Sequence, residues 1–158
     1  FSSRRRHTRL ASVSWARRMC IRDSLLNDWS QAGSGIVGEL DESETELEFL
    51  KRIKKTFEVG CLRHNKLKGR EIQKVALCGG AGAFLLPQAI WSGADVFITG
   101  EIKYHDYFGH EEDILMAEIG HYESEQYTKE IFYSIIRDLF PNFALQLSKI
   151  NTNPIKYL

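Results

Sequence analysis

The chain has 158 residues, of which 43% are hydrophobic and 11% aromatic, enough for one domain with its own core. Lysines plus arginines equal aspartates plus glutamates at 21 each, so the formal net charge is zero. This balance hides two unlike parts, because residues 1–23 hold seven arginines and a single acid, Asp23. Residues 24–158 hold 14 basic and 20 acidic side chains, a net charge of −6. A net-acidic body disfavours nucleic-acid binding, which needs a basic face.

Cysteine use and hydropathy exclude further classes of protein. Cys20, Cys61 and Cys78 are scattered and form no Cys-x-x-Cys pair, so neither a disulfide framework nor a zinc knuckle is indicated. We therefore expect reduced thiols and a cytoplasmic protein. No apolar run approaches the roughly 18 residues of a membrane helix, so we expect no membrane partner.

Residues 1–23 are rich in arginine and serine and nearly free of acids. This composition fits an organelle transit peptide or a disordered basic arm. The chain starts with Phe, however, and SSRRRHTRL resembles translated adapter sequence at the ends of some open reading frames. We interpret residues 1–23 as a non-native basic head and assign the domain to residues 24–158.

The first predicted elements are a loop and a helix. Residues 24–38 end in AGSGIVG, which is too rich in glycine for a helix and is typical of a turn or loop. An amphipathic helix is predicted over 43–57, with acids in its first turn and lysines toward its end. The apolar positions that define its buried side are Leu47, Leu50, Ile53 and Phe57.

Strands and helices then alternate along the chain. This alternation predicts an α/β fold, in which a largely parallel sheet is covered by helices. The predicted strands are 59–63, 74–78, 95–99, 114–119 and 143–147, and the predicted helices are 84–91, 102–110 and 122–139.

Three of the predicted strands end in glycine followed by polar residues: CGGAG at 78–82, TGE at 99–101 and IGH at 119–121. In open α/β sheets, ligands bind at the carboxyl ends of the strands. Glycine there permits a sharp turn and a close approach of the backbone. The polar residues after these glycines should therefore share one edge of the sheet.

His121 and Glu125 stand at positions i and i+4 of the last predicted helix, so their side chains project to the same side. An imidazole nitrogen with a carboxylate oxygen suits zinc, iron, manganese or cobalt. An ordinary surface hydrogen bond between them is the alternative.

Glu101 and His105 form a second i,i+4 pair at the start of the preceding predicted helix. They could be further ligands, residues that orient ligands, or a general base. Alternatively, Glu101 stabilises a helix N-terminus and His105 is merely solvated.

The Gly79–Gly82 turn could present N–H groups to an anion. It matches neither the dinucleotide fingerprint, which would need glycine where Leu85 stands, nor a Walker motif, which would need a lysine. We interpret it as a close-packed turn from strand to helix. Cys78, within an apolar run, is interpreted as a buried structural thiol.

Four separated motifs, VALCGGAGAFL, GADVFITGEIKYHD, ILMAEIGHYESEQ and NTNPIKYL, occur in that order. Together they resemble the carboxyl-terminal part of the NIF-three-like family, dinuclear metal centre proteins often described as GTP cyclohydrolase I type 2 homologues. The resemblance covers residues 33–158. It implies one lobe of a two-lobed α/β fold, with a two-metal site in the cleft and assembly as a ring-shaped homohexamer.

The same resemblance implies roles for single residues. The family's late metal ligands fall on His121 and Glu125, and its Thr-Gly-Asp segment falls on Thr99-Gly100-Glu101, with Glu in place of Asp. His105 matches a family histidine. The family's other ligands, a His-His pair and an Asp, lie in an amino-terminal lobe, and residues 1–32 contain no counterpart. The chain is therefore interpreted as a fragment that lacks this lobe.

The expected function follows from the resemblance. The intact protein should hold two divalent metal ions (zinc, iron or manganese) and hydrolyse a nucleotide-like or other small substrate. His121 and Glu125 would hold metal, with Glu101 and His105 in catalytic roles, and the fragment alone should be inactive. The alternative is a non-catalytic metal-binding scaffold or regulatory protein that acts through ring-shaped oligomers.

Overall fold

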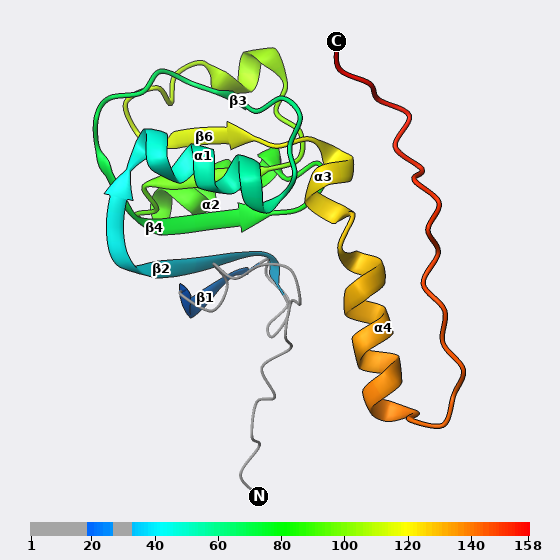
Figure 1. The fold of residues 1–158 in the computed structure, drawn as a ribbon. Coiled ribbons are helices and arrows are strands. Elements are labelled where there is room, and N and C mark those ends of the chain that lie inside the picture. Colours follow the sequence, from blue (N-terminus) through cyan, green and yellow to red (C-terminus); the bar gives the residue numbers. More distant parts are fainter. Residues whose placement is uncertain (1–18, 27–32) are drawn as a thin grey trace, which may run out of the picture.

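The computed structural model describes residues 33–158 and the backbone of residues 19–26. The described chain forms a six-stranded sheet with the strand order β1-β2-β4-β5-β6-β3 (Figure 1). The strands are β1 (Met19–Leu26), β2 (Gly33–Thr45), β3 (Arg63–His64), β4 (Glu71–Cys78), β5 (Val96–Thr99) and β6 (Leu115–Glu118).

The predicted α/β class is confirmed, and the sheet is mixed. The central strands β4, β5 and β6 are parallel to one another, as predicted. β1, β2 and β3 extend the sheet on both sides by antiparallel pairing. The largely parallel sheet is therefore right for the middle of the molecule. The second lobe stays a prediction.

Buried side chains alternate between the two faces of the central strands. Val75, Val96 and Leu115 face one apolar cluster, which contains Phe49, Leu50 and Ile53 of α1 (Glu46–Thr56). The neighbouring residues Ala76, Phe97 and Met116 face a second cluster, with Leu86 and Ala89 of α2 (Leu86–Trp91). Each face of the sheet is thus covered by one helix.

The predicted helix over 43–57 is confirmed, and three of its four predicted core positions, Leu50, Ile53 and Phe57, are buried. α1 starts after Thr45, whose hydroxyl accepts the Glu48 N–H at 3.4 Å. Leu47 was expected in the core, but 50% of its surface is exposed, whereas Phe49 is fully buried. The helical period explains this correction, because Leu47 lies about 100° round the helix from the stripe formed by Phe49, Leu50 and Ile53.

Residues 24–26 belong to β1 and residues 33–45 form the long strand β2, so the loop predicted at 24–38 is wrong at both ends. Ile36 and Val37 pair with Leu77 and Ala76 of β4, and β2 also pairs with β1. Glycine weakens a strand locally. Hydrogen bonds to β1 on one side and β4 on the other hold β2 extended, although its own sequence favours a loop.

The predicted helix over 102–110 is a single short 3₁₀ turn, η3 (Tyr104–Tyr107). The carbonyl of Ile102, which an α-helix would use internally, accepts a hydrogen bond from the Arg63 guanidinium at 3.0 Å. The predicted helix over 84–91 is present as the 3₁₀ turn η2 (Ala83–Leu85) followed by α2.

The long helix predicted over 122–139 is divided into α3 (His121–Glu125) and α4 (Thr128–Leu139). The residues between them are anchored to the end of α1. Gln126 donates to the Phe57 carbonyl at 2.8 Å, and the Tyr127 hydroxyl donates to the Thr56 carbonyl at 3.2 Å. α4 therefore leaves the body in a new direction, as Figure 1 shows.

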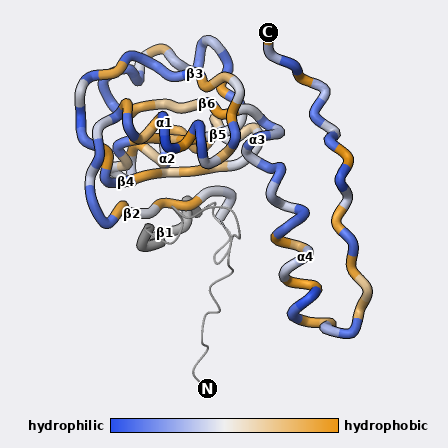
Figure 2. The backbone as a smooth tube through the Cα atoms, in the orientation of Figure 1, coloured by the Kyte–Doolittle hydropathy of each residue, from blue (hydrophilic) through white to orange (hydrophobic). Residues whose placement is uncertain are grey.

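Residues 140–158 form an extended tail that runs back beside α4 toward the body (Figure 1). The predicted strand over 143–147 has no regular secondary structure there. Figure 2 shows hydrophobic residues recurring along both α4 and this tail. No described helix is long and apolar enough to cross a membrane.

The predicted strand over 59–63 is reduced to Arg63–His64 at the edge of the sheet. Asn65 then continues the pairing through its side chain. Its Oδ1 accepts the Met116 N–H at 2.9 Å, and its Nδ2 donates to the Ile114 carbonyl at 2.9 Å. One amide side chain thus satisfies two backbone groups, one in β6 and one just before it, that a longer strand would have paired.

Candidate metal site

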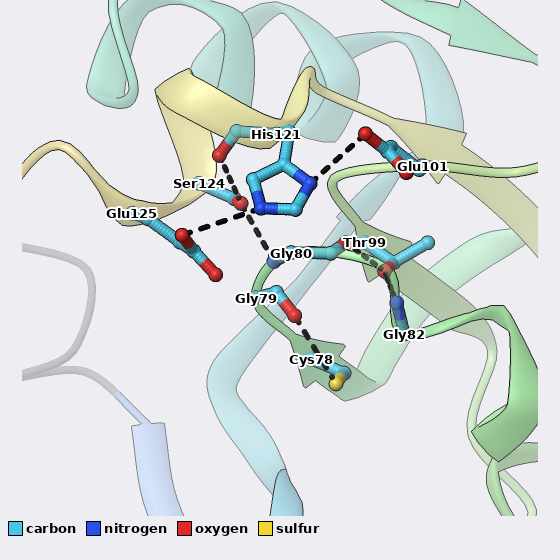
Figure 3. A network of polar contacts seen from close by, with 9 residues as sticks. All are labelled: Cys78, Gly79, Gly80, Gly82, Thr99, Glu101, His121, Ser124 and Glu125. Carbon is cyan, nitrogen blue, oxygen red and sulfur yellow. Dashed lines mark hydrogen bonds and ion pairs between the residues drawn. The ribbon is translucent and has the colours of Figure 1, made fainter.

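The parallel register brings three strand ends level with one another. Thr99 pairs with Cys78 of β4 on one side and with Glu118 of β6 on the other. The glycine turns that follow these strands therefore meet at one edge of the sheet, as predicted (Figure 3).

Gly80 joins these turns through its carbonyl and its N–H (Figure 3). Its carbonyl accepts hydrogen bonds from the Gly100 N–H at 2.9 Å, the Glu101 N–H at 3.1 Å and the Thr99 hydroxyl at 3.1 Å. Its N–H donates to the Ser124 hydroxyl at 2.9 Å, which in turn donates to the His121 carbonyl at 2.8 Å. The network fixes α3 against the sheet edge.

Close packing explains why glycine follows these strands. A Cβ at Gly100 would lie 2.7 Å from the Gly80 oxygen, 2.8 Å from the Ser124 hydroxyl and 2.9 Å from the His121 Cα. At Gly80, φ is +63° and a Cβ would lie 2.5 Å from a Glu125 oxygen. The close approach of backbone atoms therefore favours glycine at position 100, and the positive φ favours glycine at position 80.

The imidazole of His121 lies between two carboxylates (Figure 3). Its Nδ1 is 2.9 Å from Glu101 Oε1, and its Nε2 is 3.4 Å from Glu125 Oε2. All three side chains are about half exposed. The structure therefore brings together three of the four predicted site residues. Glu101 and Glu125 lie beside the two ring nitrogens of His121.

His105 is the predicted residue that lies apart from this group. Its side chain is 75% exposed, and its Nε2 is 3.9 Å from Asp106 Oδ1. The α-helix that would have placed Glu101 and His105 on one side is replaced by η3, so the i,i+4 argument does not apply to them. A catalytic role for His105 stays a prediction.

A hollow of about 560 Å³ lies beside the His121 ring. Glu101, His121 and Glu125 line one side of it, and residues 150 and 152–155 of the tail line another. Sequence reasoning missed the contribution of the tail and the linking role of Ser124. For Ser124 a signal was present, since it lies three residues after His121 and next to Glu125 in the same motif.

The donor set fits part of a metal site. One imidazole nitrogen and one carboxylate oxygen, from His121 and Glu125, face each other as two ligands of one ion would. Glu101 faces the other ring nitrogen. Within the part of the chain that the structure describes, no group of three or more His, Cys, Asp or Glu side chains could hold a metal ion. Any further ligand would have to come from elsewhere.

Two features of the glycine turn agree with a structural role. The Gly82 N–H donates to the Thr99 hydroxyl at 3.0 Å, so it and the Gly80 N–H are used within the network. Cys78 is buried, and this burial, followed by the charge of Glu125, raises the pKa of its thiol. A buried thiol with a raised pKa is a poor nucleophile.

These features define an α/β protein with a candidate metal site at the glycine-punctuated carboxyl edge of its parallel strands. The chain belongs to the Duf34/NIF3 (NGG1p interacting factor 3) family, whose model matches residues 5–154. This confirms the resemblance inferred from the four motifs. The match begins inside the predicted head, and β1 begins at Met19. Residues 1–18 lie outside the described residues, so the interpretation of the head stays a prediction.

Curated relatives carry the name GTP cyclohydrolase 1 type 2 homolog. The protein from Staphylococcus epidermidis is 36% identical over 137 residues, which cover 84% of this chain and 37% of that protein. A relative from Staphylococcus aureus is 32% identical over 131 residues, which cover 80% of this chain and 36% of that protein. The chain thus spans little more than a third of the length of these relatives.

Solved structures show the same fold. Staphylococcus aureus protein SA1388 superposes with a TM-score of 0.75 at 31% identity, covering 80% of this chain and 42% of that one. A Bacillus cereus protein related to NIF3 superposes with a TM-score of 0.66 at 24% identity, covering 82% of this chain and 38% of that one. The second similarity shows the fold alone.

Proposed function

We propose that His121 and Glu125 hold a divalent metal ion (zinc, iron or manganese) as part of a dinuclear centre. The remaining ligands would come from parts of the intact protein beyond this chain. In this proposal the intact protein is a cytoplasmic homohexamer that hydrolyses a nucleotide-like or other small substrate. The His121–Glu125 geometry supports the metal site, and family membership supports the rest.

The observation that carries the proposal is the arrangement at the two nitrogens of His121. Nε2 faces Glu125 Oε2 at 3.4 Å, while Nδ1 lies 2.9 Å from Glu101 Oε1. A metal-ligating histidine typically donates its other ring N–H to a carboxylate or carbonyl, which fixes the tautomer and orients the ring. Glu101 is placed to accept this N–H. We therefore assign Glu101 as the residue that orients His121.

The site residues would divide the work as follows. His121 Nε2 and Glu125 supply two ligand atoms, and Glu101 holds the proton on Nδ1 so that Nε2 stays free to ligate. When bound, a pair of divalent ions would polarise a phosphate or amide oxygen and provide a hydrolytic nucleophile from water. The hollow of about 560 Å³ lies within the usual range for small-molecule sites.

The test is metal content by elemental mass spectrometry on the full-length natural protein. We expect about two equivalents in the unmodified protein and their loss in the His121→Ala/Glu125→Ala double variant. The matched control is His110→Ala/Asp113→Ala, which removes another surface histidine and carboxylate whose Nδ1 and Oδ2 lie 3.1 Å apart. This control should keep its metal. Equal metal in both variants, or none in any protein, would contradict the proposal.

Turnover distinguishes the hydrolase from the scaffold. GTP, named by the relatives, is the first substrate to test, followed by other nucleotides. Metal-dependent product formation that is lost with His121→Ala would support a hydrolase. A protein that binds two ions but hydrolyses none of these nucleotides would favour the non-catalytic scaffold.

A further inference from the structure

The end of the tail also lines the hollow beside His121. We propose that residues 150–157, here called the strap, form a docked apolar wall of the site. We further infer that the hydrogen bond between Glu123 and Asn153 keeps this wall in place. The proposal deepens the proposed function and rests on it, because the strap would bind the non-reacting part of the same small-molecule substrate.

The first contact that docks the strap is made by a buried acid. Glu123 lies in α3 between the two proposed metal ligands, yet its side chain is 7% exposed. Its Oε1 accepts a hydrogen bond from Asn153 Nδ2 at 3.2 Å. A buried carboxylate needs such donors, because leaving it without them is costly. Glu123 thus turns away from the hollow and holds the strap.

Asn153 is itself fixed by local hydrogen bonds. Its N–H donates to Asn151 Oδ1 at 2.8 Å, and its Oδ1 accepts the Ile155 N–H at 3.0 Å. The following residue is Pro154, which restricts Asn153 to extended backbone. The sequence NTNPI therefore presets a turn whose central side chain points at Glu123.

The second contact lies at the end of the strap. The ring of Tyr157 packs against Gly60, where an added Cβ would lie 3.1 Å from Tyr157 Cδ2. Its hydroxyl lies 3.5 Å from the position of a Cβ at Gly120, the residue before His121. The strap is thus held at two points, one on each side of Pro154.

The strap presents apolar side chains to the hollow on both sides of Asn153. Ile150, Pro154 and Ile155 line the hollow, which His121 and Glu125 also line. An apolar wall facing a polar corner is the usual arrangement of a small-molecule site. The substrate class that fits is a small molecule whose apolar or aromatic part lies on the strap while its reacting group reaches His121 and Glu125.

The experiment compares Asn153→Ala with Asn142→Ala in the full-length natural protein. Asn142 is an exposed asparagine at the start of the same tail, away from the hollow. Hydrogen exchange of residues 148–158 reports the docking of the strap. Modification by diethyl pyrocarbonate reports access to His121. His110 is the internal control, because its side chain is 39% exposed against 44% for His121 and it also lies beside a carboxylate.

Asn153→Ala removes both the contact with Glu123 and the acceptor of the Ile155 N–H. We expect it to speed modification of His121, and exchange of strap amides other than that of Ile155, by roughly fivefold, as for the loss of the one docking hydrogen bond. His110 should react at an unchanged rate, and Asn142→Ala should behave as the unmodified protein. Unchanged exchange and modification in Asn153→Ala would overturn the proposal. Both readouts are taken on chelator-treated protein, because an ion bound to Nε2 would itself shield His121 from the reagent. Failure of the metal site would be seen separately, as absence of metal from the untreated, unmodified protein.

Discussion

The body of the molecule and its carboxyl-terminal arm each contain an amphipathic helix, but only the helix in the body has buried residues. In the body, α1 has 11 residues and buries Phe49, Leu50 and Ile53 against the sheet. In the arm, which we define as residues 128–158, α4 has 12 residues and is equally amphipathic, yet neither α4 nor the tail has a buried residue. An amphipathic pattern therefore predicts a helix, but it does not tell whether the same chain covers its apolar side.

The largest expected difference between the two regions is in backbone protection. In the isolated 158-residue chain, we expect the amides of α1 to exchange several orders of magnitude more slowly than the amides of α4. The physical reason is that an isolated helix of about 12 residues is marginal in water, whereas α1 is held by the core. Hydrogen exchange followed by mass spectrometry measures both helices in one sample.

Equal protection of α1 and α4 would break the comparison. It would mean that the apolar side of α4, which includes Phe132, Ile135 and Leu139, is covered in solution. Repeating the measurement at several chain concentrations would then show whether a second copy provides the cover.

The next largest expected effect is a difference in the stability lost when a phenylalanine of the body and one of the arm are replaced by alanine. Phe49→Ala should lower the free energy of unfolding by about 3–5 kcal/mol, because it leaves a cavity in the core. Phe132→Ala, at a position that is 59% exposed, should change it by less than about 0.5 kcal/mol. Urea denaturation of both variants measures the difference. Similar losses in the two variants would show that Phe132 is packed against something.

The smallest expected effect is a difference in stability between two glycine variants of the body. Both glycines lie at the sheet edge that carries the candidate metal site. Gly100→Ala should cost about 1–3 kcal/mol of stability, because its Cβ would meet backbone atoms of Gly80 and His121. Gly79→Ala is the matched control: its Cβ would make only ordinary contacts at 3.8 Å, so we expect a change within about 0.5 kcal/mol. Thermal unfolding compares the two. A tolerated Gly100→Ala would contradict the packing argument.

The central strands and their glycine endings could be predicted from the sequence. The runs VALC, VFIT and ILMAEI are short, mostly apolar and followed by glycine, and each contributes to one of the three parallel strands. Once these strands are parallel and adjacent, their ends must meet. For this reason the meeting of Glu101, His121 and Glu125 followed from local patterns alone.

What could not be predicted depends on partners that are distant in sequence. β2 is a strand because β1 and β4 pair with it, although its glycines indicated a loop. The break between α3 and α4 depends on the end of α1, which lies about 70 residues earlier. Likewise, the contact between Glu123 and Asn153 spans 30 residues, and no periodicity in the sequence indicates it.

The side chain of Asn65 has a consequence for the behaviour of the chain at high concentration. A sheet edge with free N–H and C=O groups is a template on which another molecule can add a strand, and this is a route to aggregation. Here the two-residue β3 and the Asn65 amide occupy those groups on β6. The sheet therefore ends on this side in a two-residue strand and one amide side chain, which offer little template for intermolecular strand addition.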